Sequence, residues 1–290
     1  VGSENIDYRL RNAEFTAAQG VQWLGMPIAT LSNLQSALVV GSNLRKDHPL
    51  FAQRIRQAAK KGCKVFSIND RVYDWALPVA ASVVAAGDWT QALADVAAAV
   101  AEAKGVTAPV AGQAHDEAKA IAAALLAGEQ KAVLLGNAAA HHAQASTLLA
   151  LANWIAEQTG ATAGYLTEAA NTVGAQFAGA HPVNSGLNAG QMLSGGLKAV
   201  LLLHTEPVFD SAAGLAGAQA LAGADMVVTL SAFKANMDFS DVLLPVAPFT
   251  ETSGSFINAE GRLQSFHAVV RPLGDTRPGW KVLRVLANLL

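Results

Sequence analysis

The residues that could do chemistry in this chain follow apolar, strand-like runs. Three such runs end at Gly41, Gly136 and His204. Ligands of open α/β sheets bind beyond the carboxyl ends of the strands, so these positions are the first candidates for a site. Gly41 opens Gly-Ser-Asn-Leu-Arg and Gly136 opens Gly-Asn-Ala-Ala-Ala, and neither sequence is a G-x-G-x-x-G fingerprint or a P-loop. We therefore favour tight strand-to-helix turns that need glycine for backbone reasons.

Metal-ligating and nucleophilic side chains are sparse. The single cysteine, Cys63, begins a predicted strand, where a lone cysteine is typical of a small core residue. An iron–sulfur cluster needs about four thiolates, so the sequence predicts none in this chain. The seven histidines are dispersed, and the adjacent pair His141 and His142 would point in different directions on a helix. We expect no metal ligand and no catalytic residue; a Ser-His-Asp triad stays open, but no G-x-S-x-G elbow marks one.

A polar segment near the C-terminus carries Glu251, Glu260 and Arg262. The two carboxylates could form a catalytic acid pair. The alternative is a salt-bridged turn that pins its loop to the sheet, with Gly254 and Gly261 supplying unusual backbone angles. We favour the structural alternative.

Composition indicates a folded α/β protein. The 290 residues are 52% apolar and 14% charged, which suits about two domains with buried cores. The net charge is −2 with scattered basic residues, so no nucleic-acid partner is expected. No apolar run reaches the length of a membrane span, so we expect no direct membrane insertion. The chain has no initiator Met and stops within a predicted helix, and we expect it to be a piece of a longer protein.

Strand and helix patterns alternate twice along the chain. They predict an α/β fold of two successive doubly wound, Rossmann-like lobes with mostly parallel sheets. The expected strands are 37–41, 63–68, 131–136, 198–204, 225–231 and 241–247, and the expected helices are 50–61, 88–102, 114–126, 141–159, 211–222 and 280–290. We predict a connector over 1–30, a first lobe over 31–112, a second lobe over 113–268 and a truncated helical segment over 269–290.

Two segments carry a resemblance to a known family. Asp241 to Pro245 reads Asp-Val-Leu-Leu-Pro, and Gly254 to Gln264 reads Gly-Ser-Phe-Ile-Asn-Ala-Glu-Gly-Arg-Leu-Gln. They resemble the "ADVVLP" strand and the "GTFxNxEGRxQ" turn of the molybdopterin oxidoreductase superfamily. The segment 41–71 is similar to the superfamily's "GxNPxxxHP…KKGxKVxxxDPR", with Leu44 in place of Pro and Asn69-Asp70 in place of Asp-Pro.

The resemblance implies where a cofactor cleft would lie. In cofactor-bearing relatives the loops of segment 41–71 touch a pterin guanine dinucleotide. The residues that would line such a cleft, here expected to be vestigial, are Gly41, Asn43, Asn69, Arg71, Gly136 and His204. Molybdenum enzymes of the superfamily usually take a Cys, selenocysteine or Ser ligand from an upstream loop, and Cys63 is not in that place.

The opening segment narrows the resemblance. Asn5 to Asn12 reads Asn-Ile-Asp-Tyr-Arg-Leu-Arg-Asn and resembles the "NIDHRLRQ" connector in the large iron–sulfur subunit of bacterial respiratory complex I, the proton-pumping NADH:quinone oxidoreductase. This resemblance implies a non-catalytic structural region without a cofactor of its own. Iron–sulfur clusters would lie in preceding N-terminal domains. The partners would be those domains and the other subunits of the peripheral arm, on the cytoplasmic face of the bacterial inner membrane.

Two alternatives remain. The first is part of a working enzyme that binds the pterin guanine dinucleotide, such as a formate dehydrogenase or a nitrate reductase. The second is a plain nucleotide-binding module.

Overall fold

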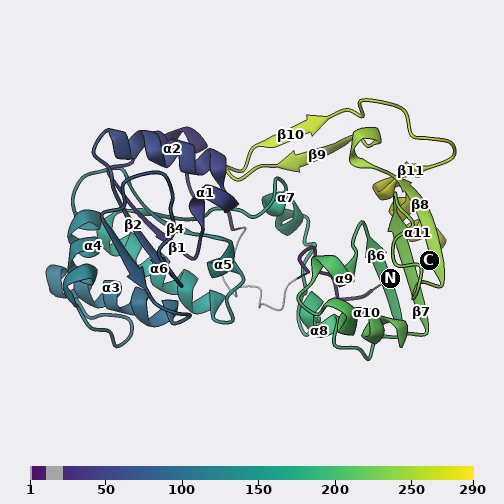
Figure 1. Cartoon of the computed structure of the whole chain (residues 1–290), viewed down its shortest axis with the longest axis horizontal. Helices are drawn as coiled ribbons and strands as arrows, with labels where there is room; N and C mark the ends of the chain where they lie inside the picture. Colours follow the sequence, from purple (N-terminus) through teal and green to yellow (C-terminus); the bar gives the residue numbers. More distant parts are fainter. Residues whose placement is uncertain (1, 11–21) are drawn as a thin grey trace. The chain divides into compact units, whose positions relative to one another are not determined.

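The computed structural model describes residues 2–10 and 22–290 and divides the chain into two compact units (Figure 1). Residues 14–177 and 257–262 form one, which we call the five-stranded unit. Residues 1–13, 178–256 and 263–290 form the other, the four-stranded unit. Each is a parallel α/β structure, which confirms the predicted fold class.

The five-stranded unit is built on a wholly parallel sheet with the order β3-β2-β1-β4-β5. Its strands are β1 (Ser36–Val40), β2 (Lys64–Asn69), β3 (Ala81–Val84), β4 (Lys131–Leu135) and β5 (Thr162–Tyr165). The central strands β1 and β4 are buried along their whole length, as expected for a parallel sheet covered on both faces.

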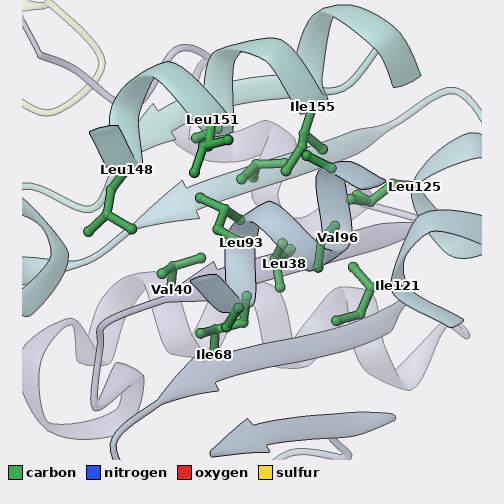
Figure 2. Packing of buried hydrophobic residues seen from close by; sticks show 14 of the residues in the cluster. Leu38, Val40, Ile68, Leu93, Val96, Ile121, Leu125, Leu148, Leu151 and Ile155 are labelled. Carbon is green, nitrogen blue, oxygen red and sulfur yellow. The ribbon is translucent and has the colours of Figure 1, made fainter. Parts of the chain in front are cut away.

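Alternate residues of these strands enter two cores. Leu38 and Val40 pack against α3 (Trp89–Lys104), α4 (Asp116–Leu126) and α6 (Ala145–Thr159), a layer visible in Figure 2. Ala37 and Val39 enter the opposite core, which also holds residues of the 3₁₀ helix η1 (Ile28–Asn33), α1 (Leu44–Asp47) and α2 (Pro49–Lys60). Successive side chains of β1 thus point to opposite faces of the sheet, and helices cover both faces, which is the arrangement of a doubly wound fold.

The free edge of β5 is covered by chain rather than by a further strand of the sheet. Trp23 O accepts a hydrogen bond from Tyr165 N at 2.8 Å, and Leu24 N donates to Ala259 O at 2.8 Å. A Cβ on Gly164 would collide with Leu24 O, so this close approach requires glycine. Residues 23–25 and then Ala259 continue the hydrogen bonding past β5, which protects an edge that would otherwise be open.

In this unit the structure differs from the prediction in the bounds of one helix and in two additional strands. The helix expected over 141–159 begins only at Ala145, as α6, and a separate short helix, α5 (Asn137–Ala140), precedes it. The strands β3 and β5 were not predicted, because each has only four residues and neither is an uninterrupted apolar run. A short helix, α7 (Thr172–Phe177), ends this part of the chain.

The four-stranded unit has a parallel sheet with the order β11-β8-β7-β6. Its strands are β6 (Ala199–Leu203), β7 (Met226–Ser231), β8 (Val242–Ala247) and β11 (Arg277–Pro278), and its helices are α8 (Ala189–Met192), α9 (Pro207–Asp210), α10 (Gly214–Ala222) and α11 (Gly279–Leu289). A 3₁₀ helix, η2 (Phe249–Glu251), precedes a two-stranded hairpin of β9 (Gly254–Ile257) and β10 (Leu263–Phe266). The buried core cluster is small and comprises Leu193, Leu202, Leu221 and Val227.

The division of the chain differs from the lobes expected from the sequence. Residues 104–112 do not separate two lobes, since α3 and α4 on either side of them pack into one core. The described N-terminal residues belong to the four-stranded unit, where Asn5 Oδ1 accepts from Leu187 N and Asp7 Oδ2 from Ala189 N. The rest of the predicted connector splits: residues 11–21 lie outside the described part, and residues 22–30 belong to the five-stranded unit.

No helix within residues 2–10 and 22–290 is long and apolar enough to cross a membrane.

Candidate functional site

The loops that follow β1, β2 and β4 meet at the carboxyl edge of the five-stranded sheet. The strand order reverses between β1 and β4, because the chain proceeds from β1 to β2 and β3 on one side and then to β4 and β5 on the other. Ligands of doubly wound folds bind at such a switch point. Five of the six predicted cleft residues lie on this edge: Gly41, Asn43, Asn69, Arg71 and Gly136.

The two glycines at this edge allow the loops to approach each other closely. Gly41 has φ +65, and a Cβ there would lie 2.6 Å from the backbone nitrogen of Ala139. A Cβ on Gly136 would lie 2.6 Å from Gly41 O and would also collide with Ser42. The backbone requirement expected for both glycines is therefore confirmed.

Asn69 connects the loops and has a free hydrogen-bonding group. Its Oδ1 accepts from Ser42 N at 2.9 Å, which fixes the amide so that Nδ2 is the remaining group. Asn69 is 2% exposed, and its Nδ2 has no partner among the described residues. Buried polar groups normally have a hydrogen-bond partner, so an unsatisfied donor at a switch point indicates a place for a ligand or an ordered water.

Three further buried polar atoms at this edge are unsatisfied within the described part of the chain: Asn43 Oδ1, His48 Nε2 and Asn137 Oδ1. His48 is 5% exposed and stacks on Phe51 with ring centroids 5.9 Å apart, and its imidazole also has a hydrogen-bonding interaction with the side chain of Asn137. Burial lowers the pKa of His48, which keeps the imidazole neutral at pH 7. This edge therefore offers uncharged hydrogen-bonding groups.

His48 and Asn137 were not among the residues predicted from the sequence. The sequence position of both residues pointed to this edge. Asn137 directly follows Gly136, and His48 lies directly after α1 and before α2, five residues beyond Asn43. What the sequence could not show is that His48 is buried and that Nε2 of His48 and Oδ1 of Asn137 are buried atoms without a hydrogen bond among the described residues.

Several charged groups near this edge have partners within the protein. Arg71 forms an ion pair with Asp70 at 3.1 Å, and its guanidinium lies over the ring of Tyr73. Asp47 accepts from Asn43 N at 2.9 Å. His141, expected on a helix, lies in the connection between α5 and α6 and pairs with Glu168 at 3.1 Å.

His204, the sixth predicted cleft residue, belongs to the four-stranded unit. It directly follows β6 with φ +52, and its backbone N donates to Leu230 O at 2.9 Å. Burial lowers the pKa of His204. The structure thus assigns it to a different sheet from the other five.

The remaining candidates have structural surroundings. Cys63 lies in the core on the α2 face of the sheet, and burial raises the pKa of its thiol to about 11. Glu260 and Arg262 form an ion pair at 3.2 Å, whereas Glu251 instead accepts from Leu273 N at 2.9 Å. The salt-bridged turn is therefore confirmed for Glu260 and Arg262, but Glu251 is not part of it. Among the described residues, no three His, Cys, Asp or Glu side chains are grouped so that they could hold a metal ion.

Sequence comparison shows the family. Residues 1–289 match the molybdopterin oxidoreductase family, and the chain belongs to that family. A protein of Staphylococcus aureus strain MRSA252 named "Putative formate dehydrogenase" is 42% identical over 52 residues, which are 18% of this chain and 5% of that protein. Its counterpart in strain USA300 gives the same identity and coverage. The matched stretch is thus a small part of those relatives.

Solved structures share the fold. Acetylene hydratase from Pelobacter acetylenicus has a TM-score of 0.66 at 14% identity, with 93% of this chain and 48% of that chain covered. A chain of the formyltransferase/hydrolase complex from Methylorubrum extorquens, solved with methylofuran, has a TM-score of 0.59 at 17% identity, with 92% and 77% covered. At these identities the similarity concerns the fold alone.

The residues at the carboxyl edge fit part of a pterin dinucleotide. The unsatisfied atoms of Asn43, His48, Asn69 and Asn137 could bond to a polar ligand. They could hold a heterocycle or sugar, which offer donors as well as acceptors.

Proposed function

We propose that this chain is part of a molybdopterin-dependent oxidoreductase in which the five-stranded unit binds the nucleotide end of the pterin cofactor. The observation that carries this proposal is the set of four unsatisfied polar atoms at the switch point. Family membership and the 52-residue similarity to a protein named as a formate dehydrogenase support it. The cofactor, when bound, would supply the redox chemistry of the whole enzyme.

In this proposal the residues of the chain bind and orient. The hydrogen bond from Ser42 N to Oδ1 of Asn69 fixes the orientation of the Asn69 side-chain amide, and Nδ2 is then available to a ligand. Neutral His48 and Asn137 add hydrogen-bonding atoms at the same edge without introducing charge. Substrate, metal ligand and electron-transfer partners are left to the remainder of a longer protein.

A thermal-shift measurement on this chain tests the proposal. Guanine nucleotide at 100 times its Kd should stabilise the folded chain by about 2.7 kcal/mol. Asn69→Asp should abolish the shift, because it keeps the acceptor for Ser42 N and replaces the free donor with an oxygen. Asn153→Asp, the same substitution at an exposed position of α6, is the control and should keep the shift. No shift of the wild-type chain by the nucleotide would contradict the proposal.

A second function is favoured by the opening segment, whose sequence resembles the connector in the large iron–sulfur subunit of complex I. The structure gives this segment a structural setting, since Glu4, Asn5 and Asp7 each hydrogen-bond to residues 184–189 of the four-stranded unit. In this alternative the chain is a non-catalytic scaffold of a membrane complex, positioning iron–sulfur domains on the cytoplasmic face. Co-purification of the full-length protein with NADH-oxidising subunits would favour it, and isolation without them would count against it.

A further inference from the structure

The turn formed by residues 257–262 is buried at its tip and exposed along its stem. Ala259 is 7% exposed and enters the core of the five-stranded unit with Leu24 and Leu166. By contrast, Ser255 and Phe256 on β9 and residues 263–265 on β10 are exposed. The base of the hairpin is held separately, by hydrogen bonds from Val269 N to Thr250 O at 2.9 Å and from Trp280 Nε1 to Ser253 O at 3.0 Å.

Among the described residues, three hydrogen bonds attach the turn to the rest of the five-stranded unit. Leu24 N donates to Ala259 O at 2.8 Å, and Ile28 N donates to Glu260 Oε2 at 2.7 Å. Ile257 N donates to the side-chain Oδ1 of Asn171 at 2.9 Å. The bond to the Glu260 carboxylate is charge-assisted and is therefore expected to be the strongest of the three.

The turn also holds its own shape. Asn258 Oδ1 accepts from Glu260 N at 3.2 Å and from Arg262 N at 2.9 Å, and Asn258 N donates to Arg262 O at 3.1 Å. Gly261 supplies φ +81. A preformed turn loses little conformational entropy on docking, so it can undock and redock as one body.

We propose that residues 257–262 act as a reversible latch, docking on residues 24–28 and Asn171. The chain enters the latch from β9 and leaves it into β10. Undocking would uncover the edge at residues 23–25 while leaving the sheet itself folded.

Amide hydrogen exchange on Glu260→Gln tests the latch. The amide keeps the volume of the side chain and removes its charge. Protection of the amides of Leu24, Ile28 and Ile257 should fall about tenfold, the effect of weakening a hydrogen bond to a charged group. The amides of Val39 and Leu134 in the central strands should be unchanged. Glu251→Gln, the same substitution at a carboxylate outside the latch, should leave all five amides unaffected.

Asn171→Ala supplies an independent variant from the opposite side of the contact. It should lower protection of the same three amides and spare the same central strands. The latch would be contradicted by wild-type protection at Leu24, Ile28 and Ile257 in both variants. It would equally be contradicted by a parallel fall at Val39 and Leu134, because that result would make the turn an inseparable part of the core. Neither outcome depends on cofactor binding.

Discussion

The parallel sheets of the two units are buried to different degrees. In the five-stranded unit helices cover both faces, and β1 and β4 are completely buried. In the four-stranded unit Val200 and Leu202 of β6 belong to a small core, while Leu201 on the other face is 50% exposed. Leu201 pairs with Val228 of β7, which pairs in turn with Val242 of β8, and Val242 is 39% exposed. The difference teaches that a parallel sheet need not imply two covered faces within its own unit.

The largest expected effect is the difference in unfolding free energy lost when one leucine in each sheet is replaced by alanine. Leu134→Ala in β4 removes a side chain that is 0% exposed and should cost about 2–5 kcal/mol of unfolding free energy. Leu201→Ala in β6 should cost about 1 kcal/mol or less, because half of that side chain is already in water. Denaturant titration of both variants checks the ratio, and equal losses would refute the comparison.

Replacing a glycine of positive φ by valine, once in each unit, should change hydrogen exchange only in the unit that carries the substitution. Gly261 and Gly196 both have φ +81, and a Cβ at either position would meet no atom closer than 3.9 Å. Each Gly→Val change should cost about 1–3 kcal/mol through backbone strain. Gly261→Val should lower exchange protection at residues 23–28, whereas Gly196→Val should lower it only in the four-stranded unit. Identical exchange maps for the two variants would show that the strain is not local.

Low pH should affect the five-stranded unit through Glu260. The hydrogen bond from Ile28 N lowers the pKa of Glu260, and Arg262 and Arg54 act in the same direction. The stabilisation is present above the ordinary value of about 4.3 and is lost as the pH falls through the lower folded value. Protection at Ile28 should therefore fall with pH below about 4.3 more steeply in wild type than in Glu260→Gln. Parallel pH curves would contradict this assignment.

The smallest effect is expected at Cys63. Cys63→Ala removes one buried sulfur and should cost on the order of 1 kcal/mol without affecting ligand binding. Since burial raises the thiol pKa to about 11, alkylation of the folded chain should remain slow at pH 8. Rapid labelling of the native protein by iodoacetamide at that pH would show that the thiol is accessible and ionised.

The sequence predicted the elements that carry continuous apolar runs and missed those that do not. β1, β4 and β7 follow such runs. β5 has the sequence Thr-Ala-Gly-Tyr and is a strand because β4 pairs with it on one side and Trp23 O accepts from Tyr165 N on the other. The division into units escaped prediction because residues 257–262 dock on residues that are distant in sequence. Composition and periodicity carry no information on such a long-range contact.

The candidate site was predicted in part. The position of Gly41, Asn43, Asn69 and Gly136 after strands was enough to place them on one edge once the strands were parallel. His204 has the same local pattern but follows a strand of the other sheet. A position directly after a strand predicts that a residue lies at the carboxyl edge of a parallel sheet. It does not show to which of the two sheets the strand belongs.

Molybdenum and pterin analysis of the purified full-length protein tests the central proposal most directly. If the switch-point edge of the five-stranded unit serves a working oxidoreductase, the protein should contain molybdenum and a pterin in stoichiometric amounts, and Asn69→Asp should reduce both. Wild-type protein that assembles with NADH-oxidising subunits and contains neither molybdenum nor pterin would contradict the proposal and support the scaffold of complex I.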